Sequence, residues 1–286
     1  MAVYERTWRR YAGALSPIRS RFLVVTRYAL TDAFASRLFT AFYALCFLPS
    51  MFGLVFIYLS HNVALLQQLG MPGDLMEMLT AKFFMLLFSW QAIPAFLIAV
   101  IVSPSLISAD LTNNALPLYL SRSIDRSDYV LGKMAVLAIL LSPLTWAMGL
   151  AVFVLQAYLE GGTWWSDNYR IGLAYVVGHL TWILVVSLLS LAISAWVRYK
   201  PAARGALFGI LFILAAFATA VNAFTGTAVG DMLNLATAID SVVMNLFGAP
   251  TSSDLPVFFN WLTLAGTCLF SIWLLRLKLR AHEVVR

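Results

Sequence analysis

Residues 108–133 read SADLTNNALPLYLSRSIDRSDYVLGK and form a polar, charge-bearing interval between two long uncharged runs. The flanking runs, 83–109 and 134–159, each exceed the ~20 apolar residues that a helix needs to cross the hydrocarbon core of a bilayer. Four more uncharged intervals reach the same length, at 38–73, 171–197, 205–230 and 255–275. The interval is therefore predicted to be a loop between the second and third of six membrane spans.

Composition also places the chain in a membrane. Hydrophobic residues make up 62% of the 286 positions and charged residues only 11%, whereas a soluble globular domain is nearer half apolar and a quarter charged. The formal net charge is +6, and its arginines crowd the N-terminus and the loops of one side. That placement is typical of a cytoplasmic membrane face, so we expect no nucleic-acid partner.

The distribution of basic residues predicts the topology. With both termini in the cytoplasm, 17 of the 19 Lys and Arg fall in inner segments, and only Lys82 and Arg170 lie outside, as the positive-inside rule requires. We expect an all-α, multi-pass protein of the cell (inner, cytoplasmic) membrane that forms one domain over 1–286. The six spans are predicted near 38–60, 83–108, 133–159, 171–197, 206–224 and 257–279, and the loop at 109–132.

Two further helices are predicted outside these spans. Residues 20–37 are apolar on one face and carry Arg27, Asp32 and Arg37 on the other, which is typical of an amphipathic helix at the membrane interface. Between the last two spans, residues 225–256 contain no Lys or Arg and carry apolar residues at helical spacing. A helix there is too short to cross the membrane, so we interpret it as a short outer-leaflet segment.

The sequence contains no catalytic or nucleotide-binding motif. There is no G-x-x-x-x-G-K-[ST], HExxH or GxSxG, so the chain is predicted not to be an enzyme and to bind no cofactor or metal itself. Polar residues within the spans are few, and each is a candidate for lining a transport pathway. A hydrogen bond to a neighbouring helix, worth ~1 kcal/mol, is the alternative role, which we favour for the histidine. These residues are Gln91, Gln156, His179 and Asn222.

The 108–133 interval has its own pattern. Asp125 and Asp128 resemble a helix capping box, so the third span is predicted to start near 126 and to extend about 50 Å, well beyond the ~30 Å core. Pro117 limits a preceding short helix to about 110–116. Exposed apolar and charged side chains then form a predicted docking element for a cytosolic partner. Its proposed contact residues are Asp110, Leu116, Tyr119, Arg122, Ile124 and Arg126.

This interval resembles the cytoplasmic loop of type-2 ATP-binding cassette (ABC) transporter permeases, in particular the group that includes copper-enzyme maturation permeases. The residues that carry the resemblance are Asp110, Ala115-Leu116, Leu120-Ser121-Arg122-Ser123-Ile124, Arg126, Tyr129 and Gly132-Lys133. Ser123 stands where that family usually has proline, and Asp110 replaces a more usual glutamate.

The resemblance implies a homodimer or heterodimer of permease subunits bound to cytosolic ABC ATPase subunits. ATP and Mg would be held by the ATPase, and the loop would act as the coupling helix. The expected function is ATP-driven transport, with export the commoner direction, of a substrate that the sequence does not identify.

Two alternatives remain open from the sequence. A six-helix secondary transporter or channel without an ATPase would be expected to show intramembrane charges or broken helices near the midplane. A membrane-embedded enzyme would be expected to cluster His, Asp, Glu or Cys at one depth, whereas the three histidines stand far apart at 61, 179 and 282.

Overall fold

The computed structural model describes residues 21–62, 68, 80–113, 115, 125–197 and 199–279. Within these ranges all regular secondary structure is helical. Six helical segments are long and apolar enough to cross a membrane, and they run over Arg37–Ser60, Ala81–Thr112, Arg126–Glu160, Trp164–Trp196, Lys200–Thr225 and Val257–Lys278. The predicted all-α, six-span architecture is therefore confirmed at this level.

The first three spans are each interrupted. The first consists of α2 (Arg37–Leu45) and α3 (Leu48–Ser60), and Pro49 stands in the first turn of α3. The second consists of α5 (Ala81–Leu106) and the short α6 (Ser108–Thr112). The third consists of α8 (Arg126–Ser142), a π-helical turn η3 (Pro143–Ala147) and α9 (Met148–Glu160). Proline removes a helical hydrogen bond, and a π-turn is one way for a helix to accommodate it.

The last three spans are single helices. They are α10 (Trp164–Trp196), α11 (Lys200–Thr225) and α13 (Val257–Lys278). α10 begins before the predicted residue 171 and α11 before the predicted residue 206, because both helices continue through polar residues at their N-terminal ends. The predicted short helix between the last two spans is present as α12 (Leu235–Leu246), preceded by the 3-10 helix η4 (Ala228–Leu233).

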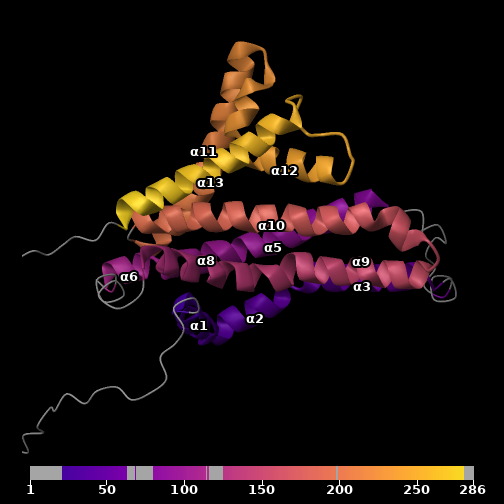
Figure 1. The fold of residues 1–286 in the computed structure, drawn as a ribbon, viewed down its shortest axis with the longest axis horizontal. Helices are drawn as coiled ribbons and strands as arrows, with labels where there is room; N and C mark the ends of the chain where they lie inside the picture. The colour runs from indigo at the N-terminus through magenta and orange to yellow at the C-terminus, as the bar shows by residue number, and fades with distance from the viewer. Residues whose placement is uncertain are drawn as a thin grey trace, which may run out of the picture.

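Figure 1 shows α5, α8, α9 and α10 running lengthwise beside one another, with α3 along α9. The main core joins α5, α8 and α10 through fully buried side chains such as Ile98, Leu137 and Leu191. α10 is the central helix, since 67% of its most apolar window is buried, against 11% for α11. In Figure 1, α11 projects away from the bundle and α13 crosses it at a slant.

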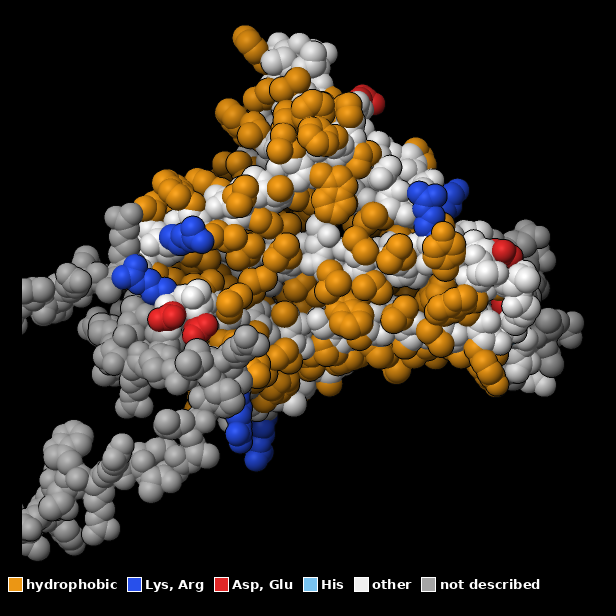
Figure 2. Space-filling view, in the orientation of Figure 1, with side chains coloured by type: hydrophobic (Ala, Val, Ile, Leu, Met, Phe, Trp, Pro, Cys, Tyr) orange, Lys and Arg blue, Asp and Glu red, His pale blue; other side chains and the backbone are white. Residues whose placement is uncertain are grey.

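One end of the bundle carries most of the described basic residues, and we call it the basic end. Arg126 begins α8 there, Lys200 begins α11, and Arg276 and Lys278 lie in the last turns of α13. In Figure 2 apolar side chains cover the middle of the visible face, and most visible Lys and Arg lie toward this end, on the left and below. That the basic end faces the cytoplasm stays a prediction.

An N-terminal helix, α1 (Arg21–Phe34), packs against the start of α8 at the basic end. The Thr26 hydroxyl donates a hydrogen bond of 2.9 Å to the backbone oxygen of Gly132. A side chain at Gly132 would come within 2.8 Å of the Phe22 backbone oxygen, so the glycine permits this close approach. A helix was predicted over 20–37, and α1 covers most of that range; its position at a membrane interface is still a prediction.

Two local predictions around the 108–133 interval are wrong. The short helix is α6, over Ser108–Thr112 rather than 110–116, because it ends at Asn113, a residue type whose side chain competes with helical backbone bonds. α8 does begin at Arg126, yet the Asp125 side chain makes no capping hydrogen bond. Asp128 still lies in the first turn, where its negative charge favours the helix dipole.

Candidate functional site

Three residues of the 108–133 interval meet in a buried polar cluster at the basic end. Lys133 Nζ lies 2.8 Å from Asp110 Oδ2, and the Tyr129 hydroxyl donates a 2.7 Å hydrogen bond to the same oxygen. We call Asp110, Tyr129 and Lys133 the stem cluster, because Asp110 and Lys133 stand at the two stems of the loop that joins α6 to α8. The cluster fixes these stems to each other.

The local structure explains why these side chains meet. Tyr129 and Lys133 are four residues apart on α8, so they lie on the same helix face, and Lys133 Nζ is 5.4 Å from the centre of the Tyr129 ring. The side chains of Lys133 and Asp110 are only 6% and 15% exposed. Each of these two mostly buried charges is stabilised by the other, because a buried charge without a partner is strongly unfavourable.

The stem cluster is linked to two further helices. Ser108, at the start of α6, donates its backbone N–H to Ser194 Oγ over 3.1 Å, and its own hydroxyl lies 2.7 Å from the Val197 backbone oxygen. These contacts hold α6 to the end of α10. On the other side, Thr26 of α1 bonds to Gly132, next to Lys133. Four helices therefore meet around the stems of one loop.

The structure describes two of the six predicted docking residues. Asp110 is engaged within the stem cluster, while Arg126 is exposed at the first turn of α8. The other four, Leu116, Tyr119, Arg122 and Ile124, lie outside the described residues. Contact of any of the six with a partner stays a prediction. The sequence analysis did not foresee the pairing of Lys133 with Asp110, although an i, i+4 Tyr-Lys pair with an acidic residue across the loop could have indicated it.

Two of the four predicted pathway residues belong to one buried network. Gln91 of α5 donates to Ser50 Oγ over 2.7 Å and accepts a 2.5 Å bond from the Tyr175 hydroxyl of α10. His179 Nδ1 lies 3.2 Å from the Tyr175 backbone oxygen, and its ring packs on Phe88 with centroids 3.7 Å apart. Tyr175, which joins these groups, was not singled out from the sequence.

The other two predicted pathway residues lie elsewhere. Gln156 Nε2 is 3.4 Å from Glu160 Oε2, and His61 Nε2 is 3.1 Å from that same oxygen at the end opposite the basic end. Asn222 Oδ1 accepts a 2.6 Å bond from the Gly230 backbone, which fixes the turn between α11 and η4. The structure thus divides the four residues among three sites. That any of them lines a pathway stays a prediction.

The described residues include no group of three or more His, Cys, Asp or Glu placed to hold a metal ion. No family model matches the chain, and no curated protein matches it either. The fold therefore carries the assignment. The chain is a multi-pass membrane protein. Its architecture of six apolar helices is suited to a transporter.

Proposed function

We propose that the chain is the membrane-spanning permease subunit of an ABC transporter, driven by a separate cytosolic ATPase and working in the direction of export. The observation that carries this proposal is the stem cluster. The buried Asp110–Lys133 pair closes the loop at its two stems, so a push on the loop would move α6 and α8 together. This is what a docking element needs if it is to transmit force to the spans.

A route for such force runs along the second and third spans. α6 continues α5 with a break only at Ile107, and α8 continues into α9 through the π-turn at Pro143–Ala147. π-turns are frequent at functional positions in helices, and this one begins at Pro143, which has no backbone N–H to donate to the helix. We propose that α8 tilts relative to α9 at η3 when the ATPase closes.

A second permease subunit is part of the proposal. α11 is mostly exposed, with Phe212, Ile213 and Phe217 each more than half exposed. Gly205 and Gly209 on the same helix have open space beside them, and small residues at this spacing allow a partner helix to approach closely in a membrane. These features support a homodimer or heterodimer that uses α11.

The ATPase partnership is testable by purification. The tagged chain, isolated from its native membranes, is expected to retain MgATP hydrolysis and a polypeptide carrying G-x-x-x-x-G-K-[ST]. The double variant Arg122→Glu/Arg126→Glu reverses two charges of the loop. It is expected to lose most of the MgATP hydrolysis and most of the co-purified polypeptide, since rim charges steer association. Phosphate release and mass spectrometry of the complex provide the measurements.

The matched control is Arg204→Glu, which reverses an exposed charge on α11 at the same end of the molecule. It is expected to retain the ATPase. Asp110 is left intact in this experiment because its substitution would disturb the stem cluster. Absence of such a polypeptide from the unaltered complex, or its full retention by the double variant, would contradict the proposal.

The predicted orientation is tested separately. A reporter fused after Arg286 is expected to be cytoplasmic, because the basic end carries the positive charges that are retained on that side. Activity of an enzyme reporter that works only outside the cytoplasm, compared with one that works only inside, measures this. A signal from the outside reporter would overturn both the orientation and a docking role for the loop.

A further inference from the structure

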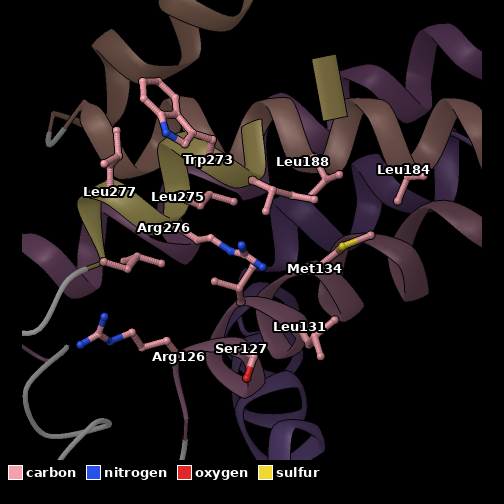
Figure 3. Close-up of a pocket in the computed structure, with 13 residues that line it drawn as sticks. Arg126, Ser127, Leu131, Met134, Leu184, Leu188, Trp273, Leu275, Arg276 and Leu277 are labelled. Carbon is pink, nitrogen blue, oxygen red and sulfur yellow. The ribbon is translucent and has the colours of Figure 1, made fainter. Parts of the chain in front are cut away.

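An open groove of about 820 Å³ lies at the basic end between α8, α10 and α13. One wall is a single face of α8 with Val130, Leu131 and Met134, and the floor includes Leu184 and Leu188 of α10. α13 supplies the other wall, which includes Trp273. Figure 3 shows Leu131 and Met134 of α8 and Leu184 and Leu188 of α10 beside the groove, with the Trp273 ring on the side of α13 away from α8. The interior of the groove is therefore almost entirely apolar.

Two arginines and a serine border this apolar space. Arg276 extends from α13 over the groove, while Arg126 and Ser127 lie in the first turn of α8, where the Arg126 side chain points away from Arg276 (Figure 3). Both arginines are exposed. Among the described residues, neither guanidinium has a carboxylate within salt-bridge distance.

Among the described residues, the charged side chains that line the groove are Arg126 and Arg276. Asp125 and Asp128 flank Arg126 in sequence but do not line the groove. Lys278 is directed elsewhere, since its Nζ lies over the Trp196 ring at 5.0 Å from the centre. The groove thus combines a long apolar wall with the charge of Arg276, and Arg126 lies nearby in the first turn of α8.

We propose that this groove binds an anionic phospholipid of the leaflet at the basic end. The phosphate would lie beside Arg276, with Arg126 turning toward it from the first turn of α8, and an acyl chain would lie along Leu131, Met134 and Leu188. Guanidinium groups bind phosphate through paired hydrogen bonds, and basic pockets between membrane helices are suited to anionic headgroups. A soluble anion would gain nothing from the apolar walls, and a zwitterionic lipid would gain less from the arginines.

The bound lipid would bridge helices that touch little otherwise. α8 and α13 both pack on α10, and the groove separates their exposed faces. A lipid between them would hold the end of α13 against the start of α8, next to the stem cluster. Binding of this kind requires no ATPase, so it can be measured on the purified chain alone.

The test uses the full chain in an uncharged detergent. Dioleoyl phosphatidylglycerol is expected to bind more tightly, and to raise the midpoint of thermal unfolding more, than dioleoyl phosphatidylcholine. Native mass spectrometry counts the retained lipids. Arg276→Gln is expected to weaken the preference for the anionic lipid about fivefold, and Arg126→Gln/Arg276→Gln about 25-fold, from typical arginine–headgroup energies.

Two control variants distinguish lipid binding in this groove from a general attraction of anionic lipid to positive charge. Arg276→Lys keeps the charge but loses the paired hydrogen bonds, so it is expected to weaken the preference less than Arg276→Gln does. Arg204→Gln removes an exposed charge outside the groove and is expected to change nothing. Glycerol 3-phosphate in large excess is not expected to displace the lipid. Equal binding of the two lipids, an unchanged preference in the double variant, or displacement by glycerol 3-phosphate would each overturn the proposal.

Discussion

Lys133→Met is expected to lower the free energy of unfolding by about 3–5 kcal/mol, because it leaves a mostly buried carboxylate without its counter-charge. Asp110 is only 15% exposed and loses the ammonium group that lies 2.8 Å from its Oδ2. The Tyr129 hydroxyl still donates to that oxygen, which favours the lower part of the range. Reversible unfolding in mixed micelles, followed by far-UV circular dichroism, measures the difference.

The double variant Asp110→Leu/Lys133→Met tests whether the stability lost in Lys133→Met comes from breaking the ion pair. Removing both charges is expected to recover a large part of the loss, because a buried ion pair replaced by apolar groups is often close to neutral. Lys278→Met provides the control, since Lys278 is only partly buried and its cation–π partner Trp196 is exposed. Such a contact contributes only about 0.5–1 kcal/mol. If Lys133→Met and Lys278→Met cost the same, the stem cluster does not stabilise the fold.

The six spans could be predicted because each is a long uncharged run, and a membrane imposes that length on any helix that crosses it. Their roles in the bundle could not be predicted. α10 and α11 have the same mean hydropathy of 2.2, yet one is mostly buried and the other mostly exposed. Lipid and neighbouring helices are about equally apolar, so hydropathy does not separate a central span from a peripheral one.

The effect of each proline on its helix could also not be predicted from the sequence alone. Pro94 and Pro143 both stand inside predicted spans, and both were open to the same reasoning about a lost backbone bond. Only Pro143 begins a π-turn, while α5 continues as an α-helix through Pro94 and Pro104. The difference depends on how neighbouring helices pack around the freed carbonyl, and that information lies in contacts between distant segments.

The contacts within the stem cluster could likewise not be predicted from the sequence. Asp110, Tyr129 and Lys133 all belong to the stretch that suggested a docking loop, but the sequence analysis took Asp110 for a surface contact. The structure pairs it with Lys133, 23 positions further along the chain, within the protein. Tyr175 was missed because it is one aromatic residue in an apolar run, and its partner Gln91 is 84 positions away.

Gly149→Ala is expected to destabilise the protein by about 3 kcal/mol, near the upper end for overpacking a buried site. The added Cβ would lie 1.8 Å from Cε1 of Tyr175. That ring cannot easily retreat, since it packs edge-on against Phe84, Phe88 and Phe247. Any shift would also disturb the hydrogen bond from its hydroxyl to Gln91. Thermal and mixed-micelle unfolding of the variant provide the measurement.

Second-site variants identify the ring as the obstacle. Gly149→Ala/Tyr175→Leu is expected to be no less stable than Tyr175→Leu alone, because the smaller side chain leaves room for the methyl group. Gly149→Ala/Tyr175→Phe keeps the ring and is expected to keep the loss. Gly266→Ala, in open space on α13, is expected to be neutral or to stabilise by up to about 1 kcal/mol through helix propensity. If Gly149→Ala is tolerated as well as Gly266→Ala, then α9 and α10 are not packed as closely as the contact of Gly149 with Tyr175 requires.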